Sequence, residues 1–151
     1  MCSKCSRHWI LAFLVFTSWV GTTLSQQVKL DAGKVMRPGL SSVLSLKVIR
    51  NNISGPVRCV VDLPKDWQLE KYYLNDFVRI DQKGTQATVS WLEFPMLDTM
   101  YYDVQVYVPQ DQPQNSVQLG ATLYYFDAMG KLVAIRANDI SVRVMKYFSR
   151  Y

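Results

Sequence analysis

Few residues of this chain could carry acid–base or nucleophilic chemistry. The single histidine is His8, and from residue 26 onward the chain keeps one cysteine, Cys59, and two glutamates, Glu70 and Glu93. Without an imidazole there is no Ser–His pair, no histidine metal ligand and no imidazole proton shuttle. We therefore predict that the chain is not an enzyme and uses no cofactor.

Cys59 and Glu93 are the strongest remaining candidates for catalysis. Cys59 could be a nucleophile only beside a base or a group that stabilises its thiolate, but it lies on the apolar face of the run at 57–63. That position predicts a buried and inert thiol. Glu93 follows Trp91 and could pair with another acid for glycosidic hydrolysis, although one acid near a tryptophan is a weak signal.

Aspartates could instead supply oxygen ligands for calcium. The candidates are Asp76, Asp81, Asp98, Asp103 and Asp127. The chain has no D-x-D-x-D-G loop, and turn aspartates usually hydrogen-bond to their own turn. We predict no metal site.

Aromatic residues are the class in excess. All nine tyrosines follow residue 25, and six form adjacent pairs at 72–73, 101–102 and 124–125. Neighbouring side chains of a strand face opposite sides, so each pair in a strand places one ring inside and one outside. Exposed rings can stack on sugars or anchor a protein partner. They are also ordinary strand formers, and the sequence leaves both interpretations open.

The first 25 residues have the order of an export signal. Lys4 and Arg7 precede an apolar run at 9–20, and a small, polar segment at 21–25 follows it. This order predicts cleavage near Ser25 and a location in the periplasm or at the cell surface. Retention of the run as a membrane anchor is the alternative, but about 20 residues are needed to span a bilayer. Cys2 and Cys5 would leave with the leader.

The remaining chain, 26–151, is predicted to be one domain by its length. Loss of the two leader charges lowers the net charge from +5 to +3, and the basic residues are scattered. Nucleic-acid binding would need a basic stripe, so no nucleic-acid partner is expected. Cys59 has no partner for an internal disulfide, which fits a bacterial envelope protein better than a small animal extracellular module.

Apolar residues alternate with period two through most of the chain. The alternation predicts strands at 27–31, 42–50, 57–63, 77–80, 87–94, 101–108, 117–125, 131–136 and 139–147, with a short edge segment within 65–76. Turn residues separate them at the spacing expected of a sandwich. The predicted fold class is an all-β, immunoglobulin-like or cohesin-like antiparallel β-sandwich of about 8–9 strands.

The expected pairing of the later strands defines a candidate binding surface. If Val108 pairs with Val117, Tyr101 lies opposite Tyr124, and if Phe126 pairs with Lys131, Tyr124 faces Val133. The predicted outer patch consists of Tyr101, Tyr124, Phe126, Val133 and Ile135. A contiguous exposed apolar patch usually marks an interaction site. A one-residue bulge at the turn would move the last strand's residues to the other face.

Several segments resemble a recurrent pattern in exported proteins of the Bacteroidota. They are the strand at 44–50, the turn at 51–55, the strand and Leu-Pro ending at 57–67, the Trp-to-Pro segment at 89–95, the tyrosine-rich strand at 119–126 and the I-x-V-x-V strand at 140–144. Asp66 stands where the pattern usually has glycine. The resemblance implies a cohesin-like or immunoglobulin-like envelope domain without catalytic residues. The ending at 147–151 does not resemble a type IX sorting domain.

These observations predict a non-catalytic binding or assembly module in the periplasm or at the cell surface. An accessory of envelope or type IX secretion machinery is the specific form of that prediction, with an envelope protein as partner. The alternative is a carbohydrate-binding module that uses surface aromatics to hold a glycan. Peripheral association with a membrane stays open.

Overall fold

A computed structural model describes residues 27–49, 53, 55–71, 78–92 and 99–146. The leader, its cleavage near Ser25, the tyrosine pair at 72–73 and Glu93 lie outside the described residues. Within the described part, no helix is long and apolar enough to cross a membrane.

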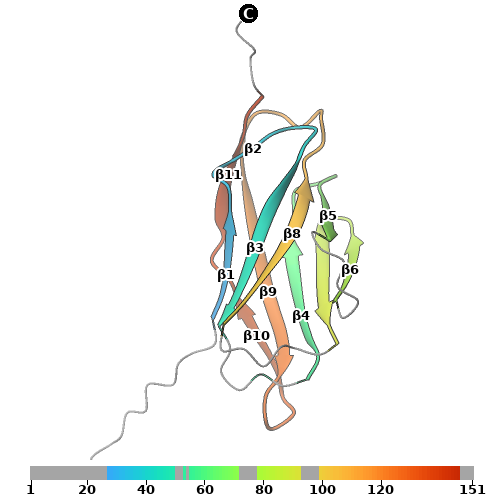
Figure 1. Ribbon diagram of the computed structural model, residues 1–151, viewed down its shortest axis with the longest axis vertical. Coiled ribbons are helices and arrows are strands. Elements are labelled where there is room, and N and C mark those ends of the chain that lie inside the picture. The colour runs from blue at the N-terminus through green and yellow to red at the C-terminus, as the bar shows by residue number, and fades with distance from the viewer. Residues whose placement is uncertain (1–26, 50–52, 54, 72–77, 93–98, 147–151) are drawn as a thin grey trace, which may run out of the picture.

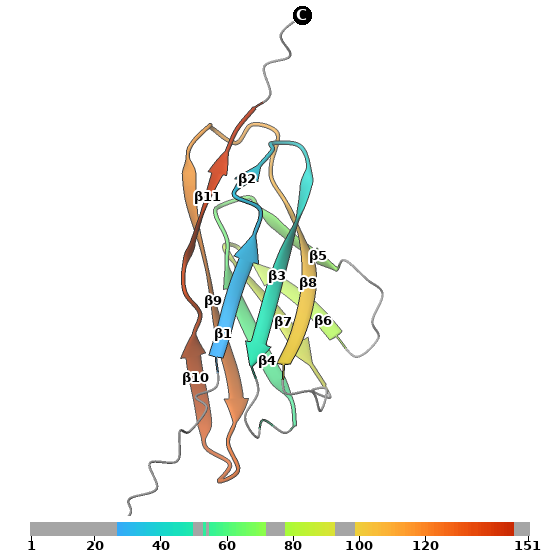
Figure 2. The ribbon, with the colours of Figure 1, turned by 60° about the vertical axis from the view of Figure 1, so that its left-hand side comes forward.

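The described residues form eleven strands in two sheets that pack face to face (Figures 1 and 2). The strands are β1 (Gln27–Ala32), β2 (Val35–Met36), β3 (Ser41–Ile49), β4 (Val57–Asp62), β5 (Gln68–Lys71), β6 (Val78–Lys83), β7 (Gln86–Trp91), β8 (Thr99–Tyr107), β9 (Ser116–Phe126), β10 (Leu132–Arg136) and β11 (Ile140–Val144). One sheet has the order β1-β3-β8-β5. The other has the order β2-β11-β9-β4-β7-β6, and β10 also pairs with β9.

The predicted all-β sandwich is confirmed, with two differences of detail. The strand number exceeds the predicted 8–9 because β2 and β5 are very short. β2 pairs in parallel with β11, so the sandwich is not wholly antiparallel. A two-residue strand shows no alternation, which is why the sequence pattern indicated only a turn there.

Alternate side chains of both sheets form one core. The predicted inward rows are buried: Leu44, Leu46 and Val48 of β3; Val57, Cys59 and Val61 of β4; Val104 and Val106 of β8; Val117, Leu119, Ala121, Leu123 and Tyr125 of β9. Period-two alternation therefore predicted the two faces of each long strand correctly.

A sharp turn precedes β5 and delivers a tryptophan to the core. Asp66 has φ 66°, in the left-handed region that favours glycine and that aspartate tolerates better than most residues. Trp67 follows with no exposed surface, and its indole N–H donates to Gln112 Oε1 at 2.9 Å. The backbone geometry explains why glycine suits this position in the pattern that the sequence resembles.

The predicted hairpin between β8 and β9 is wrong, because these strands lie in different sheets. β8 pairs with β3 and β5, whereas β9 pairs with β4, β10 and β11. Val108, expected opposite Val117, instead exchanges backbone hydrogen bonds with Gly39 (2.8 Å) and Leu40 (3.2 Å). Residues 108–115 are numerous enough to carry the chain across the sandwich.

The edges of the two sheets meet where β5 lies beside β6, and one side chain joins them. Gln82 of β6 accepts a hydrogen bond from the Leu69 N–H at 2.9 Å, and its Nε2 donates to the Trp67 carbonyl at 2.6 Å. Gln82 thereby satisfies one backbone N–H group of β5 and the carbonyl of the residue before the strand.

Candidate binding surface

Cys59, Glu70 and Asp81 are residues considered for chemistry that lie in the described part of the chain. Cys59 is a free thiol with no exposed surface. Burial, assisted by the negative charge of Asp62, raises its pKa from 9.0 to about 12, so the thiolate does not form near neutral pH. Glu70 is exposed on β5, and Asp81 is bound by Arg79 at 2.9 Å. The described residues contain no cluster of three or more His, Cys, Asp or Glu that could hold a metal ion.

Two of the three tyrosine pairs lie in described strands, and both follow the predicted alternation. Tyr101 is 65% exposed and Tyr124 lies on an outer face, whereas Tyr125 is buried. Tyr102 points inward, and its ring meets the Trp91 ring of the facing sheet edge-on, with centroids 5.2 Å apart. Its hydroxyl is buried without a partner among the described residues, and burial raises its pKa.

The structure splits the five residues of the predicted patch among three places. Tyr101 lies on the outer face of the four-stranded sheet, with Lys47 Nζ 5.1 Å from its ring centre. Tyr124 and Phe126 lie on the outer face of the seven-stranded sheet. Val133 and Ile135 face inward and pack against the core.

Val133 and Ile135 face inward because the register of β10 against β9 differs by one residue from the expected register. Phe126 pairs with Leu132, not Lys131. The loop is a turn closed by Gly130 N–H to the Asp127 carbonyl at 2.9 Å, and Gly130 has φ 75°. A three-residue loop with a glycine in this conformation is a common hairpin connection. The one-residue difference in the pairing of β10 with β9 moves every side chain of β10 to the opposite face.

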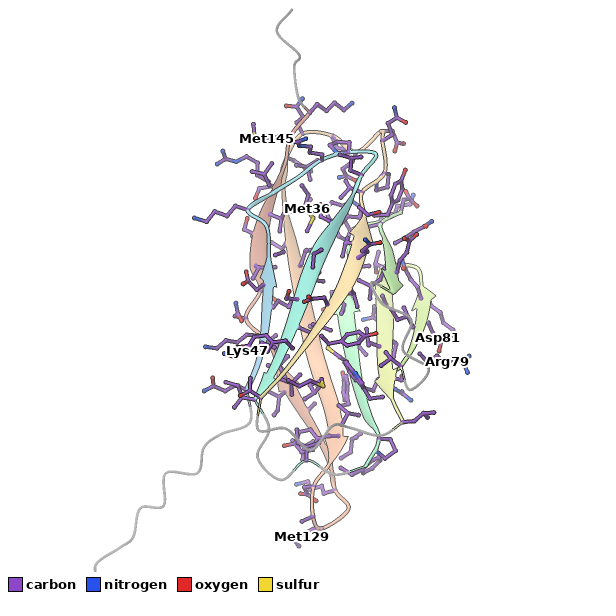
Figure 3. All side chains as sticks on the ribbon, in the orientation of Figure 1. Met36, Lys47, Arg79, Asp81, Met129 and Met145 are labelled. Carbon is purple, nitrogen blue, oxygen red and sulfur yellow. The ribbon has the colours of Figure 1, made fainter. Side chains whose placement is uncertain are left out.

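An apolar hollow occupies the end of the seven-stranded sheet next to this hairpin. We call it the apolar hollow; its volume is about 630 Å³, and it is lined by Pro56, Val57, Arg58, Val60, Gln86, Ser90, Trp91, Leu92, Tyr124, Tyr125, Phe126 and Leu132. Three of these side chains are large, apolar and well exposed: Leu92 (68%), Phe126 (51%) and Leu132 (56%). The hairpin projects beyond the sandwich, with Met129 at its tip (Figure 3).

A polar hollow of about 480 Å³ continues from it across β4, β7 and β6, and the two share Arg58, Gln86 and Ser90. Strand pairing places Tyr124, Arg58 and Ser90 in one row across the sheet. The outer face thus changes from aromatic to polar along that row, and Arg58 stands at the change.

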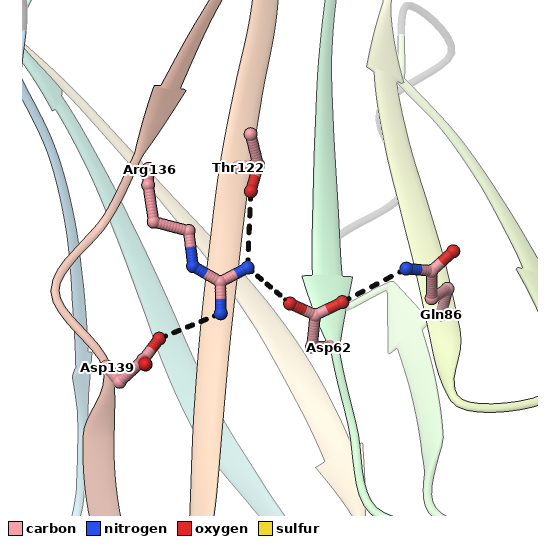
Figure 4. Close-up of polar contacts among 5 residues, drawn as sticks. All are labelled: Asp62, Gln86, Thr122, Arg136 and Asp139. Carbon is pink, nitrogen blue, oxygen red and sulfur yellow. Dashed lines mark hydrogen bonds and ion pairs between the residues drawn. The ribbon is translucent and has the colours of Figure 1, made fainter.

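The neighbouring guanidinium groups of this face are neutralised within the chain. Arg79 binds Asp81 at 2.9 Å. Arg136 extends across β9 to Asp62 and also binds Asp139 at 2.9 Å (Figure 4). Arg58, by contrast, has no carboxylate partner among the described residues. An exposed guanidinium beside aromatic rings is suited to a carboxylate or another anionic group.

Sequence reasoning missed Leu132, Leu92 and Arg58 as members of this surface. Leu132 was hidden by the register error, and its own alternation within β10 was the signal that could have revealed it. The ion pair of Arg136 with Asp62 joins residues 74 positions apart, and no local pattern indicates it.

No model of a known protein family matches the sequence, and no curated protein matches it. Among solved structures, the fold is similar to BcpA, the major pilin subunit of Bacillus cereus, with a TM-score of 0.60, 10% identity, and coverage of 80% of this chain and 40% of that one. A structure titled as manganese lipoxygenase of Gaeumannomyces graminis with partial zonadhesin of Komagataella pastoris matches with a TM-score of 0.53, 11% identity, and coverage of 78% and 46%.

A collagen-binding domain from a Staphylococcus aureus adhesin matches 81% of this chain and 99% of its own length, with 11% identity and a TM-score of 0.43. This likeness is too weak to carry an argument. The chain spans less than half of the pilin it matches. The predicted immunoglobulin-like β-sandwich is confirmed.

Proposed function

We propose that the chain is a non-catalytic binding or assembly module, exported to the cell surface or bacterial envelope, which holds a protein partner over the apolar hollow. The observation that carries the proposal is the grouping of exposed Leu92, Phe126 and Leu132 on one sheet face, around Arg58, which has no carboxylate partner among the described residues.

The exposed apolar side chains of the hollow support the proposal that it binds a partner. Single exposed apolar side chains are common, but contiguous ones in a hollow usually mark a contact site. Aromatic residues and arginine are also the types that contribute most to protein interfaces. The partner that fits offers an apolar side chain for the hollow and a carboxylate for Arg58.

Two observations support the location. The leader has the order of an export signal, and the fold is shared with a pilin subunit of the bacterial surface. An accessory role in Bacteroidota envelope or type IX secretion machinery is the specific form we propose, on the sequence resemblance alone.

Tyr124→Ala tests the proposal, with Tyr101→Ala as its matched control. Both variants remove one outward-facing tyrosine ring from a strand, but on opposite sheets. Crosslinking in the envelope of the exporting cell, followed by purification, should recover a stoichiometric protein with the wild type and with Tyr101→Ala. Tyr124→Ala should recover at least tenfold less. Equal recovery by all three proteins would contradict the proposal.

A glycan is the alternative occupant, because Tyr124 and Phe126 present two rings along one strand face, beside polar Ser90 and Gln86. Aromatic rings in such a setting can stack on sugars. Retention on a glycan array that Tyr124→Ala abolishes, without any protein partner, would support this alternative against the protein partner.

A further inference from the structure

β10 has an open edge that plays no part in the proposed function. We propose that two copies of the chain associate through their β10 strands, which pair antiparallel about a two-fold axis at Ala134 and join the two seven-stranded sheets.

The printed hydrogen bonds show which backbone groups of β10 face its open edge. The Asp127 N–H donates to the Lys131 carbonyl at 3.0 Å, and the Ala137 N–H donates to the Ala121 carbonyl at 2.8 Å. Hydrogen-bonded and non-hydrogen-bonded pairs alternate along an antiparallel ladder. With the observed register, the backbone N–H and C=O groups of Leu132, Ala134 and Arg136 therefore point away from β9.

No strand of the described part covers that edge. β10 pairs with β9 alone, and β1 approaches it while pairing only with β3. Figure 2 shows β10 at the margin of the sandwich. A row of unpaired backbone groups on an edge strand is a template for another strand.

The outer edges of β1, β5 and β6 carry features that oppose pairing, and the edge of β10 does not. β6 carries Arg79, Asp81 and Lys83 on its outward side, and Gln82 accepts a hydrogen bond from the Leu69 N–H of β5. β1 carries Lys29 and Asp31. In β10, positions 132–135 are Leu, Val, Ala and Ile, without the charge or proline that usually blocks an edge.

The sequence of β10 fits a second copy of itself. Antiparallel pairing centred on Ala134 places Leu132 opposite Arg136 of the second copy and uses every outward backbone group, which gives about six interstrand hydrogen bonds. No like charges face each other in this register. The Arg136 guanidinium is held over β9 by Asp62 and Asp139, away from the edge (Figure 4).

Side chains on the inner face favour the same pairing. Val133 and Ile135 are only partly buried although they pack against the core. In the paired arrangement Val133 lies opposite Ile135 of the second copy, so the two β-branched side chains cover each other. Apolar cross-strand pairs of this kind stabilise a sheet.

Charged substitutions of opposite sign at position 134 test both the interface and its register. Ala134 is exposed on the outer face, so Ala134→Lys and Ala134→Glu leave the core untouched. Because position 134 faces itself across the axis, each variant alone places like charges opposite each other. An equimolar mixture of the two places opposite charges there.

The measurement is the mass in solution of the full chain, by light scattering or sedimentation, at up to about 1 mM. The wild type should have twice the 17.4 kDa of one chain. Ala134→Lys and Ala134→Glu alone should be monomers, and their mixture should recover the dimer. Gln68→Lys and Gln68→Glu, on an exposed position of the other sheet, should each remain dimeric.

Circular dichroism and the thermal midpoint show that each variant is folded. A monomeric wild type, or a dimer that persists in both single variants, would overturn the proposal. Loss of partner recovery in Tyr124→Ala with an unchanged dimer separates this edge from the apolar hollow, so the two proposals fail independently.

Discussion

Above pH 9, ionisation of Cys59 should make the free energy of unfolding depend on pH. The thiol lies in β4 between Val89 and Leu123 of the neighbouring strands and has no exposed surface. Burial, with a smaller contribution from Asp62, raises its pKa from 9.0 to about 12.

The sign follows from proton binding in the two states. Below pH 9 the thiol is protonated in both the folded and the unfolded chain, so it contributes no pH dependence. As pH rises from 9 to 12, the unfolded chain loses this proton while the folded chain keeps it. The free energy of unfolding should then fall by about 1.4 kcal/mol per pH unit.

Urea unfolding of the wild type and Cys59→Ala at several pH values isolates this contribution. Between pH 8 and pH 10 the wild type should lose about 1.4 kcal/mol more than the variant. Tyr102 and Tyr125, whose pKa values are also raised by burial, titrate in both proteins and cancel in the comparison.

Thiol labelling supplies an independent readout. At pH 8 the raised pKa alone lowers the thiolate population about a thousandfold relative to an exposed cysteine, so native labelling should be slow and labelling in denaturant complete. Cys59→Ser should cost about 1–3 kcal/mol, because a hydroxyl would enter an apolar row. Parallel pH profiles for the wild type and Cys59→Ala, or rapid native labelling, would refute the reasoning.

Three further experiments test local features of the fold. Asp66→Gly should raise the free energy of unfolding by about 0.5–1 kcal/mol in urea unfolding, because φ 66° is unfavourable for a side chain; a loss of stability would contradict this. Asp127→Ala should cost about 1 kcal/mol, since Asp127 Oδ1 accepts hydrogen bonds from the Met129 and Lys131 N–H groups, each at 2.9 Å; an unchanged thermal midpoint would contradict it. A Cβ on Gly120 would overlap the guanidinium of Arg136, so Gly120→Ala should displace that group from Asp62. Asp62→Asn should therefore lower the free energy of unfolding by up to about 1 kcal/mol in the wild type and leave it unchanged in Gly120→Ala. Equal losses in both backgrounds of this double-mutant cycle would contradict the reasoning.

The sequence predicted which face of each long strand is buried, because alternation is a local property. Cys59, Tyr101 and Tyr124 all lie on the faces that alternation indicated. Local patterns do not specify which strands pair, and so the β8–β9 hairpin was wrong. The chain crosses between sheets after Tyr107, and only long-range packing decides that.

The candidate site, like the fold, was predicted only in part. Tyr124 and Phe126 belong to the observed outer surface, whereas Val133 and Ile135 do not, because Phe126 pairs with Leu132 where Lys131 was expected. A one-residue difference in register, which hydrophobic periodicity does not reveal, decided the composition of the surface.

Site-specific photocrosslinking tests the central claim most directly. A photoreactive phenylalanine analogue at position 126 lies at the apolar hollow, and the same analogue at position 101 lies on the opposite sheet. Irradiation in the exporting cell should give one discrete protein adduct from position 126, with a mass that is not a multiple of the mass of the exported chain itself, and none from position 101. An absence of adducts from position 126, or equal adducts from both positions, would contradict the claim that the chain holds a protein partner over the apolar hollow.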